Sequence, residues 1–262
     1  MRKSTVLAKI RAGQAAKIAQ LGHMLPPFVA YAAHAGYDGI WLDNEHFPMD
    51  NREVQTLLAF SHLYDIDIVV RTPTREKTRL YRYLEDGAAG LIIPLVSTPE
   101  EARDLVQKVK FPPMGDRGLS PPNLQANFGL DVQGDRQSLV DHALRETFII
   151  AQIETPQAVR NIDAIAAVPG LDGVFVGPAD LGLRMQHETE EHRIAYEETL
   201  AKTAAAARAH GKFWATMPRN VEQVRDEVER GAQFLVWGGD TEMLNAGLHK
   251  HGQELDDVLN GG

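Results

Sequence analysis

Three short apolar runs in the chain end in acidic or basic side chains. They span residues 39–46 (GIWLDNEH), 149–154 (IIAQIE) and 174–180 (VFVGPAD). A buried strand that stops on a carboxylate or an imidazole delivers that group to one rim of a sheet, where parallel sheets carry their chemistry. The groups at these ends are two carboxylates suited to a divalent metal and an Asp/His pair suited to proton transfer.

Glu154 and Asp180 are the candidate metal ligands. Two carboxylates leave room for water and a bidentate substrate, which favours octahedral Mg²⁺ or Mn²⁺, with Co²⁺ and Zn²⁺ as further candidates. The alternative is that both residues cap helices, because Thr155-Pro156 and residues 178–180 could each begin one. Their joint position at the ends of neighbouring strands favours the metal.

His46 is the candidate general base, and Asp43 could orient and polarise its ring. Two carboxylates precede it at a strand end, whereas other histidines lie on predicted helices or tails, where we expect them to be solvated. Those include His34, His62, His142, His192 and His210. Glu45 would point away from His46 if the strand continued, so we expect it to hydrogen-bond metal-bound water.

Arg71 ends the third predicted strand, where its guanidinium could stabilise a developing oxyanion. The alternative is a structural ion pair with a nearby carboxylate. Gly177, Pro178 and Ala179 form a small-residue turn whose backbone N–H groups could hold a substrate carboxylate. Gly238-Gly239 could do the same or could be only a turn.

The lysines of the predicted strands do not suit Schiff-base chemistry, which needs a lysine near the carboxyl ends of the strands. Lys17 and Lys212 fall at the starts of predicted strands, on the opposite face. Stabilisation of a carbanion would therefore come from the metal and Arg71.

The elements that would position these groups alternate along the whole chain. Apolar runs rich in β-branched and aromatic residues are separated by amphipathic stretches, which is typical of a parallel sheet with crossover helices. The predicted strands are 17–25, 38–43, 67–72, 90–96, 148–154, 173–176, 213–217 and 234–237. Eight units of about 33 residues predict a single-domain (β/α)8 TIM barrel over residues 1–262. A doubly wound open sheet is the alternative, but no Gly-x-Gly-x-x-Gly follows the first strand.

Local signals mark where helices begin and end. Thr98 begins a capping box with Glu101, and Asp50 and Thr155 are similar starts. Glycines stand where helices should give way to strands, at positions 36, 87, 170 and 231.

Residues 111–147 interrupt this rhythm. A Pro/Asn/Gly-rich segment precedes a helix predicted over residues 136–145. Because a crossover loop this long is more often functional than idle, we expect a lid or a subunit contact there.

The bulk composition narrows the partners. At 262 residues and 44% hydrophobic, the chain can bury a full core. A net charge of −9 without a basic tract argues against nucleic acid and membrane as partners, and zero cysteines exclude disulfides and thiolate chemistry. No apolar run approaches the ~20 residues that span a bilayer and no signal peptide is visible, so we expect a cytoplasmic protein.

Taken in order, several motifs resemble those of the HpcH/HpaI aldolase family over most of the chain. They are residues 38–46, 70–71, 94–96, 112–118, 152–155 and 170–181. The resemblance implies a metal-dependent class II aldolase on a (β/α)8 barrel, which reversibly cleaves 4-hydroxy-2-oxo acids into pyruvate, or hydroxypyruvate, and an aldehyde. It also implies a homo-oligomer, a hexamer built as a trimer of dimers with an exchanged C-terminal helix.

The resemblance also implies roles for single residues. Glu154 and Asp180 would bind the metal with Gln152 beside it, and backbone amides near Ala179 would hold the carboxylate of the 2-oxo acid. This 2-oxo acid would chelate the metal through its keto and carboxylate oxygens.

The resemblance also implies that His46, paired with Asp43, transfers the proton. It implies that Arg71 stabilises the enolate and the aldehyde oxygen.

Departures from the family pattern surround the expected aldehyde pocket. Phe47-Pro48 follow the Glu-His pair where many members have Gly, and residues 21–25 lack a Trp that many members carry. The acceptor aldehyde and the choice between the two donors therefore stay open.

Three rival functions remain. A CoA-ester lyase of the citrate lyase β-subunit type would need a basic site for the CoA phosphates, and the 111–147 segment offers only Arg117, Arg136 and Arg145. A non-catalytic barrel acting as a binding or assembly protein would not explain the retained charged residues. Decarboxylation of oxaloacetate would use the same enolate and could coexist with aldol cleavage.

Overall fold

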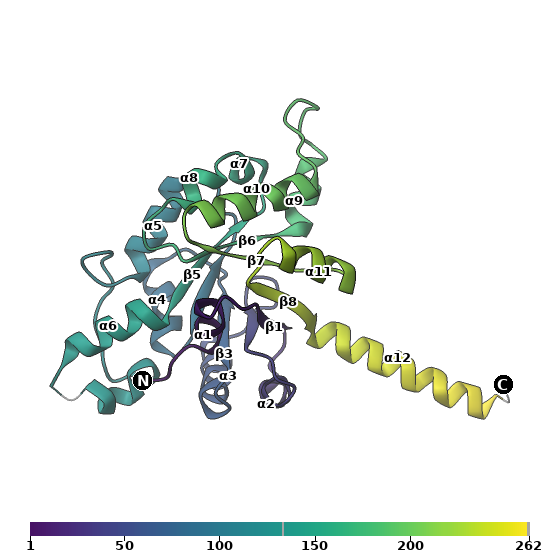
Figure 1. Ribbon diagram of the computed structural model, residues 1–262. Helices are drawn as coiled ribbons and strands as arrows, with labels where there is room; N and C mark the ends of the chain where they lie inside the picture. Colours follow the sequence, from purple (N-terminus) through teal and green to yellow (C-terminus); the bar gives the residue numbers. More distant parts are fainter. Residues whose placement is uncertain (133, 261–262) are drawn as a thin grey trace.

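The computed structural model describes residues 1–132 and 134–260, and its centre is a closed barrel of eight parallel strands in sequence order (Figure 1). The strands are β1 (Ala16–Leu21), β2 (Gly39–Asp43), β3 (Asp67–Arg71), β4 (Gly90–Ile93), β5 (Phe148–Ile153), β6 (Gly173–Val176), β7 (Phe213–Thr216) and β8 (Phe234–Gly239). This topology confirms the predicted (β/α)8 barrel and excludes the open doubly wound sheet.

Helices alternate with the strands and surround the barrel. They are α1 (Thr5–Arg11), α2 (Pro26–His34), α3 (Asn51–Leu63), α4 (Lys77–Glu85), α5 (Pro99–Val109), the 3-10 segment η1 (Leu124–Val132), α6 (Arg136–Glu146), α7 (Pro156–Arg160), α8 (Ile162–Ala166), α9 (Pro178–Met185), α10 (Tyr196–Ala209), α11 (Val221–Glu229) and α12 (Asp240–Leu259). Asp50 and Thr98 form the predicted capping boxes, and Thr155 caps α7. The glycines predicted at helix ends all adopt positive φ.

Two strands end three or more residues earlier than predicted. β1 stops at Leu21, because the chain turns at Gly22 and Pro26 begins α2. β4 stops at Ile93, because Pro94 has no N–H to donate to a neighbouring strand. The connections that follow are longer, and both contribute to the site.

Side chains alternate along each strand between the barrel interior and the helix layer. The interior is filled by an apolar cluster that includes Ile18, Trp41, Val69, Ile92, Ile150, Phe175, Ala215 and Val236. Two residues further along their strands, the same alternation places Gln20, Asp43, Arg71 and Gln152 at the mouth formed by the carboxyl ends. The carboxyl-terminal mouth of the barrel is therefore lined by polar side chains, whereas the interior is filled by apolar ones.

The 111–147 insertion is not a lid over this mouth in its central part. Within η1, Leu124 lies against Gly87, in the turn that precedes β4, and Asp131 pairs with the N-terminal amino group of Met1. Both contacts lie at the amino-terminal end of the barrel, opposite the end that carries chemistry in this fold. The expected subunit contact stays a prediction.

α12 leaves the barrel after β8 and extends away from it (Figure 1). Leu244, Leu248, Leu255 and Val258 on this helix are 54%, 74%, 61% and 80% exposed. Within the described ranges, no helix combines the length and apolar character needed to cross a membrane.

Candidate active site

Asp43 and Arg71 form a buried ion pair across two neighbouring strands. They are register partners in the β2–β3 ladder. Arg71 Nε donates to Asp43 Oδ1 at 2.9 Å, and Nη2 donates to Oδ2 at 2.5 Å. Arg71 Nη1 also lies 3.2 Å from Glu45 Oε2, and the guanidinium carbon lies 4.7 Å from the centre of the Trp41 ring. The ion pair is present, and because a guanidinium has five N–H groups it still leaves donors available at the mouth.

The ring of His46 is not paired with Asp43, which corrects the expected dyad. The Asp43 carboxylate is occupied by Arg71 and by the backbone N–H groups of Glu45 and His46, at 3.1 and 3.3 Å. The carboxylate beside the ring belongs to Glu45, with 3.9 Å between His46 Nε2 and Glu45 Oε2. Burial raises the pKa of Glu45, although Arg71 and His46 act to lower it. Asp43 therefore positions the turn that carries His46, and Glu45 is the acid that faces its ring.

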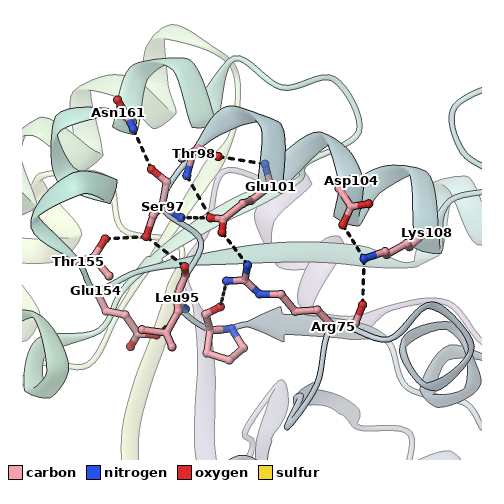
Figure 2. Close-up of polar contacts among 11 residues, drawn as sticks. Arg75, Leu95, Ser97, Thr98, Glu101, Asp104, Lys108, Glu154, Thr155 and Asn161 are labelled. Atoms are coloured by element: carbon pink, nitrogen blue, oxygen red, sulfur yellow. Dashed lines mark hydrogen bonds and ion pairs between the residues drawn. The ribbon is translucent and has the colours of Figure 1, made fainter.

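Glu154 follows β5 and is almost fully buried at the mouth. Its Oε1 accepts the Leu95 N–H at 2.7 Å (Figure 2). Its Oε2 accepts Gln152 Nε2 at 2.5 Å. Leu95 has φ of 60°, an unusual conformation for leucine that turns its N–H toward Glu154. A Cβ at Gly177 would lie 2.6 Å from Glu154 Oε2, so only glycine allows this approach. Two loops besides its own thus position this carboxylate.

Neither metal candidate serves as a helix cap. Thr155 takes that role for α7, and its hydroxyl lies 2.7 Å from Ser97 Oγ, which ties the loops after β4 and β5 together (Figure 2). Asp180 stands inside the first turn of α9, where Gly177 is the N-cap. Its side chain is 38% exposed and lies 3.7 Å from Arg184.

Within the described residues, the Glu154 carboxylate has no cationic side chain in contact with it, and Arg71 only partly offsets its burial. Burial raises the pKa of Glu154 to about 7, against the lowering effect of the Leu95 N–H, and the nearby carboxylates of Asp180 and Glu45 raise it further. A bound cation would remove this imbalance.

The donor set fits a hard divalent cation. Glu154 and Asp180 supply carboxylate oxygens, and Gln152 Oε1 is buried with no hydrogen-bond partner in the described part of the chain. Carboxylate and amide oxygens suit Mg²⁺ or Mn²⁺, which keep several water or substrate ligands. Across residues 1–132 and 134–260, no three His, Cys, Asp or Glu side chains are arranged for a metal, so a cation here would need those external ligands.

The small-residue turn lies where a substrate carboxylate could bind. Gly177, Pro178 and Ala179 lead into α9, and the first N–H groups of a helix have no acceptor within it. Gly238-Gly239 form the end of β8, and Gly238 has φ of 77°, as a turn requires.

Some histidines differ from expectation. His62 and His142 are partly buried rather than solvated, and burial lowers the pKa of both. His23 is not among the predicted site residues, yet its Nδ1 lies 2.7 Å from Asp240 Oδ2 at the mouth. The sequence offers no signal for this contact, because the two residues stand at opposite ends of the chain.

A cavity of about 650 Å³ opens beside these groups. Its lining includes Gln20, Phe47, Pro178, Met217 and Asp240. Phe47 follows His46, and Pro178 follows Gly177, so the cavity adjoins both the proton-transfer and the metal candidates.

Known proteins resemble this chain over most of its length. The family model described as HpcH/HpaI aldolase/citrate lyase matches residues 23–246. A hydroxypyruvate/pyruvate aldolase of Roseovarius nubinhibens is 34% identical over 81% of this chain and 81% of its own length. A 5-keto-4-deoxy-D-glucarate aldolase of Salmonella arizonae is 36% identical over 82% of both chains. The crystal structure of an HpcH/HpaI aldolase from Desulfitobacterium hafniense superimposes with a TM-score of 0.86 at 30% identity, covering 96% of each chain.

Proposed function

Because the chain belongs to the HpcH/HpaI aldolase/citrate lyase family, we propose that it is a metal-dependent class II aldolase. The reaction is the reversible cleavage of a 4-hydroxy-2-oxo acid into pyruvate or hydroxypyruvate and an aldehyde, which makes the protein a carbon–carbon lyase. The names of its relatives support this substrate class. The observation that carries the proposal is the buried Glu154 carboxylate beside Asp180 and the unpartnered oxygen of Gln152.

Glu154, Asp180 and Gln152 would hold the divalent cation, Mg²⁺ or Mn²⁺. Such a cation would supply the positive charge that withdraws electrons from the keto group of the 2-oxo acid. The free N–H groups around Ala179, at the start of α9, bind the carboxylate of the same substrate.

Arg71 stabilises the oxygen that becomes negative as the carbon–carbon bond breaks. Asp43 and Glu45 hold its guanidinium on two sides, and Trp41 supports its face. Because the group is already fixed, little reorganisation is needed as charge develops.

His46 moves the proton. Its ring is 57% exposed at the mouth, with Nε2 toward Glu45. In the cleavage direction, a ring nitrogen of His46 removes the proton of the 4-hydroxyl group, and the carboxylate of Glu45 stabilises the imidazolium that results. Asp43 contributes by holding the backbone of this turn.

The test is cleavage of 4-hydroxy-2-oxo acids, followed by the release of pyruvate with and without EDTA. Activity that EDTA removes and Mn²⁺ restores supports the proposal. His46→Ala should lower turnover far more than it weakens Mn²⁺ binding. Equal loss of both would make His46 a metal ligand, and activity that survives EDTA would refute metal dependence.

A CoA-ester lyase is the second candidate, because the family description includes citrate lyase. Of the three arginines in the insertion, Arg117 is buried and donates to Gln125 at 2.6 Å, so it is not available to CoA phosphates. Cleavage of an acyl-CoA substrate, with no cleavage of hydroxy-oxo acids, would favour this candidate. A barrel without catalytic function would show neither activity and would not need to bind Mn²⁺.

We also propose that the protein is a homo-oligomer, up to the hexamer that the family resemblance implies. The exposed leucines of α12 support self-association, because an apolar helix face is normally covered. Light scattering of the full chain and of Leu248→Glu checks this. A monomeric full chain would contradict it.

A further inference from the structure

His23 and Asp240 form a second Asp–His pair at the mouth, outside the machinery assigned above. His23 Nδ1 lies 2.7 Å from Asp240 Oδ2, and the Asp240 side chain is 3% exposed. The same carboxylate accepts the backbone N–H groups of Gly22 at 3.1 Å and His23 at 3.0 Å. A buried carboxylate with three donors is locked in place, and it locks the ring of His23 with it.

The pair fixes which ring nitrogen is available. A carboxylate accepts hydrogen bonds, so in this contact Nδ1 of His23 is the donor and carries the proton. In the neutral imidazole the other nitrogen, Nε2, is then an acceptor without a proton. Because the His23 side chain is 53% exposed, this acceptor can serve a ligand.

Phe47 connects the pair to the reacting groups. Its ring stands edge-on to His23 with 5.2 Å between centroids, and it lies so close to Gly22 that a Cβ there would be 2.8 Å from Phe47 Cγ. Phe47 and Asp240 both line the 650 Å³ cavity that reaches Pro178 beside the metal candidates. His23 does not line this cavity itself, but its ring contacts both of these lining residues and therefore stands at the cavity's edge.

We propose that His23, held by Asp240, accepts a hydrogen bond from a hydroxyl group of the acceptor aldehyde, and so selects hydroxylated aldehydes over apolar ones. This inference rests on the proposed aldolase function and names the substrate class of its second subsite. A pocket that pairs a substrate hydroxyl discriminates against an analogue in which a methyl group replaces it, because the polar group of the protein is then left unpaired.

The experiment compares glycolaldehyde with propionaldehyde, which have the same number of heavy atoms, as acceptors for pyruvate in the condensation direction. The ratio of the two kcat/KM values is measured for the wild type, His23→Phe and Asp240→Asn. We expect wild type to favour glycolaldehyde and His23→Phe to lower the ratio about tenfold, the effect of one lost hydrogen bond. Asp240→Asn should lower it as well, since an amide donating to Nδ1 forces the proton onto Nε2. His34→Phe, on the exposed end of α2, is the matched control and should leave the ratio unchanged.

The outcomes separate the two proposals. A wild type that exchanges pyruvate protons but shows no preference for glycolaldehyde, or an unchanged ratio in His23→Phe, overturns the role of His23 alone. An equal loss with both aldehydes also overturns it, because His23 would then be structural. A wild type that neither exchanges pyruvate protons nor condenses it with either aldehyde overturns the proposed function.

Discussion

Two buried acids at opposite ends of the barrel, Asp67 and Glu154, have contrasting surroundings. At the amino-terminal end, Asp67 begins β3 and is fully buried, and its carboxylate accepts from Arg2, from Ser4 Oγ at 2.5 Å and from the N–H of Val6 at 3.0 Å. At the carboxyl end, the Glu154 carboxylate accepts from the N–H of Leu95 and the amide of Gln152, and within the described residues it is in no ion pair. A cation of the fold contacts the first acid, whereas the second has the carboxylates of Asp180 and Glu45 nearby and Arg71 acting on it without contact.

This difference separates structural charges from functional ones. Lys110 and Asp172, 2.8 Å apart and also at the amino-terminal end, repeat the Asp67 arrangement. At the mouth, burial raises the pKa of Glu154 to about 7, a cost that a bound ligand would remove. We therefore expect changes at the mouth to affect activity and changes at the other end to affect stability.

Glu154→Ala should give the largest effect. Metal-dependent exchange of pyruvate protons should fall by at least about 10³-fold, because a metal ligand is lost, while the free energy of unfolding should stay equal or rise. Asp180→Ala should behave alike, and Glu100→Ala, exposed on α5, is the control. Near-normal exchange rates would show that the metal assignment is wrong.

Asp67→Asn should do the opposite. Removing the charge leaves the partly buried Arg2 with the exposed Asp65 as its remaining acid, which should lower the free energy of unfolding by about 3 kcal/mol. Urea denaturation measures this loss. Exchange rates of the folded variant should match the wild type, and a loss of activity without a loss of stability would break the comparison.

Arg71→Lys should lower kcat about 100-fold with little change in stability. A lysine keeps the charge but cannot reproduce the two-point contact with Asp43 or the stacking on Trp41. Steady-state kinetics of cleavage provide the measurement. A change within threefold would mean that the ion pair is only structural.

Gly177→Ala should have a smaller effect, confined to the metal. Its Cβ would lie 2.6 Å from Glu154 Oε2 and 2.8 Å from Gln152 Nε2, so both side chains must move. We expect Mn²⁺ affinity to fall about tenfold, as when groups that orient metal ligands are displaced. Calorimetric titration checks this, with Gly182→Ala, where the added Cβ meets open space, as the control. Equal affinities in both variants would exclude the close approach.

Glu227→Gln should have the smallest effect, a pH-dependent change in stability without a change in activity. It tests the comparison with a buried acid outside the mouth. Glu227 is a buried acid of α11, far in sequence from the metal candidates, and burial raises its pKa. An acid whose pKa is higher in the folded than in the unfolded state lowers the free energy of unfolding as pH rises above the unfolded pKa, and does so fully above the folded pKa. Below the unfolded pKa the acid is protonated in both states and has no such effect. The variant should therefore raise Tm at pH 8, show no gain near pH 4, and leave activity unchanged. A loss of turnover would contradict the expectation that buried acids outside the mouth affect stability and not activity.

The sequence was sufficient for the barrel and for the strand ends to within about two residues, except at β1 and β4. Apolar β-branched runs, capping residues and glycines are local signals, and each corresponds to an element that forms where predicted. The same runs placed Asp43, Arg71, Gln152 and Glu154 at the mouth, because alternation along a buried strand fixes the side that a side chain takes.

Partners across the barrel were beyond the sequence. Asp43 meets Arg71 because the register of β2 against β3 pairs them, and no local pattern encodes that choice over His46. The left-handed Leu95 and the contact of His23 with Asp240 likewise depend on the closed barrel. The expectation that the 111–147 insertion could be a lid failed for η1 for the same reason, because the length of a segment does not say which end of the barrel it covers.

The most direct test of the account is proton NMR of pyruvate in D₂O with the purified protein and Mg²⁺, repeated with EDTA. Loss of the methyl signal with Mg²⁺ and its persistence with EDTA is the predicted result, because an enolate would form only with the cation held by Glu154 and Asp180. A methyl signal that persists with Mg²⁺ at the same rate as in EDTA would contradict a metal-dependent pyruvate aldolase.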